Sequence, residues 1–315
     1  MNYPSFYDVV IAYDRIKSYV HQTPVLSSSS INDMMGCTLF FKCENFQKVG
    51  AFKYRGASNA VLSLNAMQRA QGVATHSSGN HAAALALAAR ENGLPAYIVM
   101  PDNAPEIKKK AVKGYGAQIT FCAPTQRDRE LTLKAVQART GAILVHPYNQ
   151  WEVICGQGTA ALELMQQQPD LEAVMAPVGG GGLLSGTATY LKGKYPGIRV
   201  LAGEPLMSDD AYRSFNSGVL HPVDKPETIA DGLRTSLGEL TFAIIREKVD
   251  DIYTVSEASI ISAMRLIWER MKIIVEPSSA VPLAAVMENK EAFRKQRVGI
   301  ILSGGNVDLA HLPFS

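Results

Sequence analysis

Short apolar runs alternate with longer segments of helical period along most of this chain. From residue 73 the pattern predicts four strands separated by three helices, in the runs VATHS, NHAAALALAAREN, AYIVMP, EIKKKAVKGY, AQITFC, RDRELTLKAVQART and AILVHP. Fully apolar strands between helices of this length are typical of βαβ units, whose strands lie parallel in one sheet. Gly93, Gly114 and Gly141 follow the helical runs and are predicted to end them in the left-handed conformation.

A second series of the same kind follows. The strand runs AVMAPVGG, RVLAGEP, DIYTV and VGIILSGG are again separated by helices, which predicts a second parallel sheet within residues 150–315. The first seventy residues contain two helical runs and one strand run, TLFFKCE, but their periodicity does not indicate which sheet they join. The predicted fold class is α/β, with two open parallel sheets.

Composition contributes mainly by exclusion. The 315 residues are 47% hydrophobic and 19% charged, which is enough apolar material for two packed domains. The net charge is +2 without a block of like charges, so we expect no nucleic-acid surface and no basic membrane patch. The N-terminus lacks a signal-peptide pattern and no apolar stretch could span a bilayer, which predicts a cytoplasmic protein. The four cysteines form no CxxC pair and are expected to be free thiols.

Four successive glycines at residues 179–182 follow a predicted strand and precede a predicted helix. Their backbone N–H groups are unshielded at the positive end of that helix, a place suited to a phosphate group. A tight turn without a ligand is one alternative, and Glu204, about twenty residues further on, leaves a dinucleotide ribose site as another. The cluster does not match GxGxxG and the sequence lacks GxxxxGK[ST], which disfavours NAD and ATP chemistry.

Further polar segments stand at predicted strand ends. THSSGNH, at residues 75–81, could bind a carboxylate, or Asn80 or Ser78 could simply cap the next helix. Ser303 begins a glycine-rich exit from the last apolar strand. Lys53, in GAFKYRGA, could on its own be an ordinary solvated lysine. Parallel sheets build their binding sites at the carboxyl ends of strands, so these segments form a candidate site.

These segments also occur in an order that resembles a known family. GAFKYRGA, THSSGNHAAALA, PVGGGGLLSG, GEPLMSDD, VEPSSA and LSGGNVD are similar to the fold type II pyridoxal-phosphate enzymes, specifically the serine racemase and serine/threonine dehydratase family, including threo-3-hydroxyaspartate ammonia-lyase-like members. The resemblance covers essentially the whole chain. It implies two open α/β domains, like those of the tryptophan synthase β chain, with the cofactor in the cleft between them. The large domain would comprise residues 1–68 and 150–315, and the small, substrate-gating domain residues 69–149.

The resemblance implies a role for each motif at the cofactor. Lys53 would form the Schiff base with pyridoxal phosphate, Asn80 would hydrogen-bond the ring's 3-oxygen, and Ser303 would face the pyridine nitrogen. A neutral hydroxyl at that nitrogen does not enforce ring protonation and favours loss of a β-leaving group. Phe52 would pack near the ring, and the phosphate would be bound by Gly179, Gly180, Gly181 and Gly182.

The same resemblance places the substrate carboxylate at Ser77, Ser78, Gly79 and His81. The freed Lys53 amine would remove the Cα proton, and loss of the β-hydroxyl would lead to an oxo acid and ammonia. Racemisation also needs an acid/base on the opposite face, for which Ser78 is the candidate, although it could only bind the carboxylate. Dedicated threonine dehydratases of the family usually have alanine there. Ser78 therefore favours a serine racemase that also dehydrates L-serine and L-threonine.

The alternative is a threo-3-hydroxyaspartate ammonia-lyase, or a catabolic threonine dehydratase without racemase activity. A second substrate carboxylate would need a cation, and Arg129, with Thr235, is the candidate. Arg129 lies in the charged run RDRE and could equally be a solvated helix residue. Ala51 and Ala82 depart from the serine and glycine that the family commonly has, but neither change removes a named catalytic group.

Glu204 and Asp210, with Ser208 between them, resemble the family's divalent-cation site of two carboxylates, a backbone carbonyl and water. Oxygen ligands suit Mg²⁺, Ca²⁺ or Mn²⁺, and the lack of clustered Cys or His argues against zinc. The alternative is an acidic loop in which Asp209 or Asp210 caps the next helix. The family further implies a homodimer that acts on small hydroxy amino acids.

Overall fold

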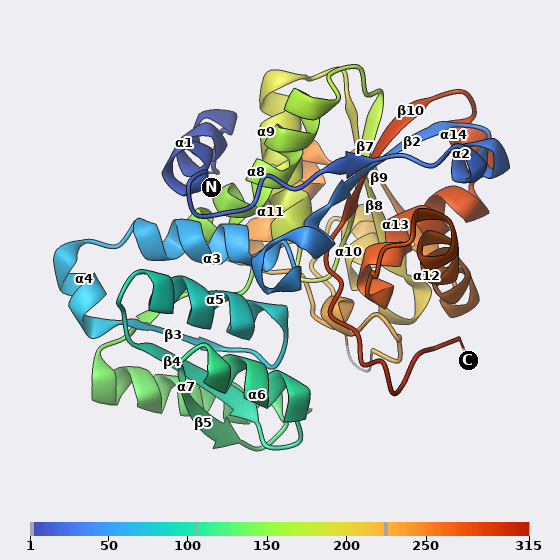
Figure 1. Ribbon diagram of the computed structural model, residues 1–315. Helices are drawn as coiled ribbons and strands as arrows, with labels where there is room; N and C mark the ends of the chain where they lie inside the picture. Colours follow the sequence, from blue (N-terminus) through green and yellow to red (C-terminus); the bar gives the residue numbers. More distant parts are fainter. Residues whose placement is uncertain (1–2, 105, 224–225, 315) are drawn as a thin grey trace.

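The computed structural model of the protein describes residues 3–104, 106–223 and 226–314. Its strands form two sheets that occupy separate parts of the molecule (Figure 1). The four strands predicted from residue 73 onward form the smaller sheet, which is parallel throughout and has the order β5-β4-β3-β6. Their bounds are Val73–His76 for β3, Ala96–Pro101 for β4, Gln118–Cys122 for β5 and Ile143–Leu144 for β6. The predicted α/β class is confirmed.

The larger sheet has six strands in the order β1-β2-β10-β7-β8-β9. The four strands predicted beyond residue 150 are parallel neighbours in it: β7 (Ala173–Pro177), β8 (Arg199–Pro205), β9 (Asp251–Val255) and β10 (Arg297–Leu302). The strand TLFFKCE, now β2 (Thr38–Cys43), adds beside β10 in parallel. Only β1 (Val25–Leu26) is antiparallel, and its two residues are too short for a recognisable strand pattern.

Helices cover both faces of the larger sheet. One face packs on α12 (Glu257–Met271) and α13 (Pro277–Glu288), and the other on α1 (Phe6–Ile16), α8 (Trp151–Gln167), α9 (Gly182–Lys194) and α11 (Glu239–Lys248). The remaining elements of this part are α2 (Ser29–Met35), α10 (Asp210–Ser217), α14 (Lys290–Phe293) and the 3₁₀ turns η1 (Glu44–Phe46), η2 (Lys48–Gly50), η3 (Leu206–Ser208) and η4 (Asp231–Leu233).

The smaller sheet is covered by α7 (Gln126–Thr140) on one face and by α5 (Asn80–Glu91) and α6 (Glu106–Gly114) on the other. The helix α3 (Lys53–Leu62), followed by α4 (Ala66–Gln71), lies between the two parts (Figure 1). It packs against α8 on one side and α5 on the other. The position of α3 matters because Lys53 is its first residue.

The left-handed helix ends are correct at two of the three predicted glycines. Gly93 and Gly141 have φ of +68° and +72°, but Gly114 still belongs to α6, and Gly116 takes φ +84° instead. Helical hydrogen bonding continues past Gly114, since the Tyr115 N–H donates to the Ala111 carbonyl at 3.1 Å.

All four cysteines are free thiols; Cys37, Cys43 and Cys155 are buried and Cys122 is half-buried. Within the described ranges, every helix is too short or too polar to cross a membrane.

Candidate active site

Lys53 stands where two of the sequence motifs meet. The Phe52 N–H donates to the Ser303 carbonyl at 3.0 Å, and Ala51 pairs with Gly304 in an antiparallel bridge. The Lys53 amine donates to the Pro147 carbonyl at 2.8 Å and lies 5.1 Å from the centre of the Phe52 ring. Burial lowers the pKa of Lys53 to about 8, although the nearby Glu276 carboxylate opposes this shift. A lysine amine that is partly neutral near neutral pH can act as nucleophile and base.

The loop before α5 has no side-chain cap. The N-cap residue is Gly79, so neither Asn80 nor Ser78 caps this helix, and the capping alternative is wrong. Asn80 instead donates from Nδ2 to both Glu276 carboxylate oxygens at 3.1 Å, and its Oδ1 accepts from Asn306 at 2.9 Å. These bonds join the smaller part of the molecule to the larger one. Gly79 N–H donates to Ser77 Oγ at 3.3 Å. The Ser78 hydroxyl makes no hydrogen bond within the described residues.

Ser303 is 3% exposed, and its hydroxyl lies 3.1 Å from that of Ser279. Ser279 also accepts from the Gly304 N–H and donates to the Gly304 carbonyl, both at 2.6 Å, which fixes the end of β10. Glu276 is 4% exposed, and burial, with the charge of Asp231, raises its pKa to about 7. The sequence analysis assigned no role to Glu276 or Ser279, although both belong to the VEPSSA segment that opens α13.

The glycine turn, residues 179–182, is packed too closely for side chains. A Cβ atom at Gly179 would lie 2.8 Å from the Leu233 Cα, and one at Gly180 would lie 2.3 Å from the Tyr148 ring. Gly181, the N-cap residue of α9, has φ +87°, and no side chain caps the helix. Within the described ranges, the N–H groups of residues 179–181 donate to no backbone carbonyl. Unbonded amides at the start of a 13-residue helix fit a phosphate group, which also explains why four glycines occur here.

His81 is buried in the smaller part, where its Nε2 lies 3.0 Å from the Val145 carbonyl. Burial, with the charge of Lys53, lowers its pKa to about 3, so the ring is neutral. The Arg129 side chain is half-buried, and its Nε is buried without a partner among the described residues, which disfavours an ordinary solvated arginine. Its charge adds to burial in lowering the pKa of His76, although Glu130 opposes this shift.

Glu204 and Asp210 are both fully buried. The two oxygens of Glu204 accept from the Ala211 and Tyr212 N–H groups at 2.8 and 2.7 Å, and Asp210 Oδ2 accepts from the Leu237 N–H at 3.1 Å. Asp210 Oδ1 is buried with no partner in the described part of the chain. Burial raises the pKa of Asp210 to about 7, and burial together with the Asp210 charge raises that of Glu204.

The capping alternative for this acidic segment is wrong, because α10 has no side-chain cap from Asp209 and its first N–H groups bond to Glu204 instead. Ser208 Oγ donates to the Leu233 carbonyl at 3.1 Å. Within the described ranges, no group of three or more His, Cys, Asp or Glu side chains is arranged so that it could hold a metal ion. Two buried carboxylates with an unsatisfied oxygen fit a hard divalent cation whose other ligands are neutral oxygens.

Three features fit an enzyme of the fold type II pyridoxal-phosphate class. They are a half-buried lysine amine, a bare glycine turn at a helix start and a hydroxyl at the end of a strand. The family model described as "Pyridoxal-phosphate dependent enzyme" matches residues 16–304. The chain therefore belongs to that family.

Similar proteins refine this assignment to the racemase and ammonia-lyase branch. The chain is 51% identical over 315 residues to the beta-hydroxyaspartate dehydratase of Paracoccus denitrificans, with 100% of both chains covered. The crystal structure of serine racemase from Dictyostelium discoideum has 50% identity and a TM-score of 0.93, covering 97% of this chain and 99% of that one. The crystal structure of a T.th. threonine deaminase has 44% identity and a TM-score of 0.93, with the same coverage. The predicted family and enzyme class are confirmed.

Proposed function

We propose that this chain is a pyridoxal-phosphate-dependent serine racemase that also eliminates water from L-serine and L-threonine to give an oxo acid and ammonia. The Lys53 amine carries the proposal, because its pKa of about 8 leaves part of it neutral near neutral pH. Pyridoxal phosphate, when bound, supplies an electron-withdrawing ring that weakens the Cα–H bond of an attached amino acid. The names of the Dictyostelium racemase and the threonine deaminase support the two halves of the proposal, racemisation and ammonia loss.

The residues around Lys53 fit the cofactor. The glycine turn would hold its phosphate through the unbonded N–H groups, and Phe52 would pack near its ring. Asn80 belongs to the smaller part of the molecule and Ser303 to the larger, and their amide and hydroxyl would orient the ring. The Lys53 amine would take the Cα proton on its own face.

The loop before α5 would hold the substrate carboxylate through the Ser77 and Ser78 hydroxyls and the N–H groups of Gly79 and His81. The ring of His81 is less suited to this role than its backbone. If Nε2 carries the proton and donates to the Val145 carbonyl, Nδ1 is left as an acceptor, which would repel a carboxylate.

Ser78 is the acid/base proposed for the second face, since its hydroxyl has no partner among the described residues to hold it elsewhere. The test is to incubate the holoenzyme with L-serine in D₂O and to measure both the D-isomer and the oxo acid. We expect Ser78→Ala to abolish racemisation while dehydration persists. Equal loss of both activities would exclude this role. Lys53→Ala should remove both activities and the cofactor's absorbance at the visible edge; a Lys53→Ala protein that kept them would contradict the whole proposal.

A second candidate is L-threo-3-hydroxyaspartate ammonia-lyase activity. The unpartnered Nε of Arg129 favours it, because a second substrate carboxylate would satisfy this buried donor. Thr235 could add a hydroxyl. The Paracoccus relative is named a beta-hydroxyaspartate dehydratase, which supports a hydroxyaspartate as substrate. Arg129→Met should raise KM for hydroxyaspartate far more than for serine, whereas Arg127→Met, on the exposed side of the same helix, should change neither. A catabolic threonine dehydratase would give oxo acid from threonine and no D-serine.

We further propose a structural Mg²⁺, Ca²⁺ or Mn²⁺ ion bound by Glu204, Asp210 and an oxygen of Ser208. The buried, unpartnered Asp210 oxygen supports it. Chelation is expected to lower the melting temperature, and identical melting curves with and without Mg²⁺ would refute the ion.

We also propose that the protein is a cytoplasmic homodimer. In each subunit, residues 69–149 would gate the substrate, and residues 1–68 and 150–315 would hold the cofactor. Tyr7 and Ile11, 66% and 55% exposed on α1, support an association surface. Light scattering after size exclusion would test the dimer.

A further inference from the structure

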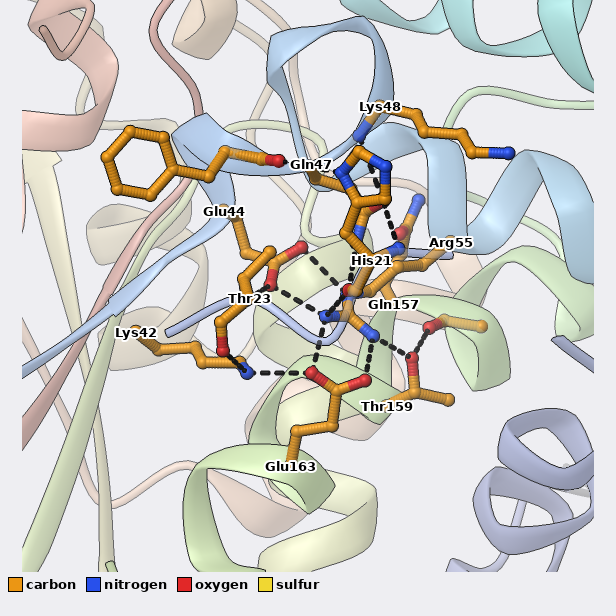
Figure 2. A network of polar contacts seen from close by, with 12 residues as sticks. His21, Thr23, Lys42, Glu44, Gln47, Lys48, Arg55, Gln157, Thr159 and Glu163 are labelled. Carbon is orange, nitrogen blue, oxygen red and sulfur yellow. Dashed lines mark hydrogen bonds and ion pairs between the residues drawn. The ribbon is translucent and has the colours of Figure 1, made fainter. Parts of the chain in front are cut away.

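The helix α3 carries a second cation two residues after Lys53. Arg55 is fully buried, which is unfavourable unless carboxylates pair with it and all of its donors are satisfied. Both conditions hold (Figure 2). Nε and Nη2 donate to the two oxygens of Glu44 at 2.7 and 2.8 Å, and Nη1 and Nη2 donate to the two oxygens of Glu163 at 2.8 Å. The other Nη1 donor reaches the Thr159 hydroxyl at 3.2 Å.

The two carboxylates come from different elements of the larger part. Glu44 follows β2, and Glu163 belongs to α8. Lys42 completes the network, because its amine donates to Glu163 and to the Thr23 carbonyl, each at 2.7 Å. Two cations thus balance two carboxylates. A planar guanidinium bound at two edges is fixed in direction as well as distance, so Arg55 sets both the position and the rotation of the first turn of α3.

Glycines bring the helices into backbone contact beside this network. A Cβ atom at Gly156 of α8 would lie 2.6 Å from the Gly56 Cα of α3, and one at Gly186 of α9 would lie 2.3 Å from the Ile154 carbonyl of α8. We call Gly56, Gly156, Gly158 and Gly186 the glycine seam. The seam places α8 between α3, which begins at Lys53, and α9, which begins at Gly182. The distance between the lysine and the glycine turn is therefore set through α8.

We propose that Arg55, held by Glu44 and Glu163, is a positioning residue that directs the Lys53 amine toward the glycine turn. This inference rests on the proposed function, because only a reaction at the Lys53 amine makes its direction important. Arg55 acts through geometry, since burial, opposed by Glu276, accounts for the lowered pKa of Lys53, while the charges around Arg55 balance.

Lys42 provides a matched control. It is as buried as Arg55 and bonds the same Glu163, but its hydrogen bonds are to Thr23, Glu163 and Gln167, none of which belongs to α3. If the network only stabilises the fold, Arg55→Lys should change kcat and the reactivity of Lys53 no more than Lys42→Met does. If Arg55 positions Lys53, only Arg55→Lys should change the reactivity of Lys53. This variant keeps the positive charge and loses the planar guanidinium.

The experiment measures three quantities in the wild-type, Arg55→Lys and Lys42→Met proteins. The first is the urea midpoint of unfolding. The second is the pH dependence of Lys53 acylation in the cofactor-free protein, measured by peptide mass spectrometry. The third is the pair of constants kcat and KM of the holoenzyme. We expect Arg55→Lys to lower kcat about tenfold or more with KM changed less than about threefold, because small misplacement of a reacting group is costly. Burial lowers the pKa of Lys53 to about 8. In Arg55→Lys the amine should become better hydrated, so this pKa, read as the pH midpoint of Lys53 acylation, should rise. Lys42→Met should lower only the urea midpoint.

Equal changes in kcat and in the acylation midpoint for both variants would overturn the proposal, as would an unchanged acylation midpoint in Arg55→Lys. If Arg55→Lys does not fold, Glu44→Gln replaces it with the same expectations, since it weakens one of the two carboxylate pairs and leaves Lys42 in place. The acylation measurement uses neither cofactor nor substrate. Failure of the proposed function would instead appear as a wild-type holoenzyme that forms neither D-serine nor oxo acid.

Discussion

Two pairs of buried carboxylates in this molecule differ in the charges that surround them. Glu44 and Glu163 lie around Arg55 and Lys42, whereas Glu204 and Asp210 accept only from backbone N–H groups within the described ranges. Burial alone would raise the pKa of Glu44, but the charges of Arg55 and Lys42 outweigh it and hold that pKa below its usual value. The pKa values of Glu204 and Asp210 are raised. The first pair is balanced by two cations of the chain, and the second is the pair for which we propose a divalent cation.

The largest loss of stability should follow from removing the Arg55 cation from between Glu44 and Glu163. Arg55→Met leaves two carboxylates buried with only Lys42 to balance them, and breaking such a pair costs about 3–5 kcal/mol of unfolding free energy. Urea unfolding followed by circular dichroism would measure the loss. A cost below about 1 kcal/mol would mean that water reaches the network and that the contrast between the pairs is smaller than the geometry indicates.

The next effect is the response of the second pair to Mg²⁺ and pH. Because the folded-state pKa of Asp210 is raised from 3.8 to about 7, its protonated form stabilises the metal-free fold at low pH, and this stability is lost as pH rises through 7. Mg²⁺ competes with that proton, so the Mg²⁺-induced rise in melting temperature should be small near about pH 5 and largest above about pH 7.

At saturating Mg²⁺ the rise should correspond to about 2–3 kcal/mol if the ion is present at about a hundredfold excess over Kd. Comparing melting with Mg²⁺ and with chelator at each pH cancels the contribution of Glu276, whose pKa is also raised. The first pair has the opposite sign, since the stability from Glu44 is lost only as pH falls below its usual pKa. A Mg²⁺ effect independent of pH would argue against Asp210 as a ligand.

A smaller effect is expected from Asp210→Asn. The amide oxygen can still accept from the Leu237 N–H, and the amide nitrogen replaces an oxygen that has no partner among the described residues. The metal-free protein should gain about 1 kcal/mol above neutral pH, because a buried unpaired charge is removed. Its melting temperature should no longer respond to Mg²⁺. Asp209→Asn serves as the control, because Asp209 is half-buried and pairs with Arg213, and this variant should keep the Mg²⁺ response.

The smallest effect should come from an ion pair outside both clusters. Arg265 and Glu269 lie one turn apart on α12, with side chains 63% and 50% exposed. Solvent already screens their charges, so Arg265→Ala should leave the melting temperature within the scatter of repeat scans. A clear decrease would show that charge alone, without burial, carries much of the stability assigned here to the Arg55 network.

The sequence predicts every strand except the two-residue β1, because the predicted strands are short, largely apolar runs between turn residues. It could not place β2 beside β10, since that pairing joins Leu39 to Val298 and leaves no local signal. The motifs around Lys53, Asn80 and Ser303 were expected to form one site, and the structure brings their segments together. The catalytic, cofactor and metal roles given to these residues remain predictions.

The buried partners were beyond the reach of pattern reading. Arg55 and Glu163 are 108 positions apart, and each alone resembles an ordinary charged residue on a helix. Glu276 stands before a proline that starts α13, which indicates a helix boundary and hides its contact with Asn80. The segment KYRGASNAV around Arg55 also contains Lys53, Ser58 and Asn59, so its composition does not indicate that the guanidinium is buried.

The two sides of α3 differ in how firmly they are held by their neighbours, and this affects how the molecule can move. Toward α8 it is locked by the glycine seam and the Arg55 fork. Toward α5 it meets a surface rich in alanine, including Ala82, Ala84 and Ala88. Small side chains interlock weakly, so we expect opening to proceed as a sliding of α5 along α3, a shear motion, while the lysine stays with the larger sheet. Substrate could then enter and leave without disturbing the lysine that we propose acts on it.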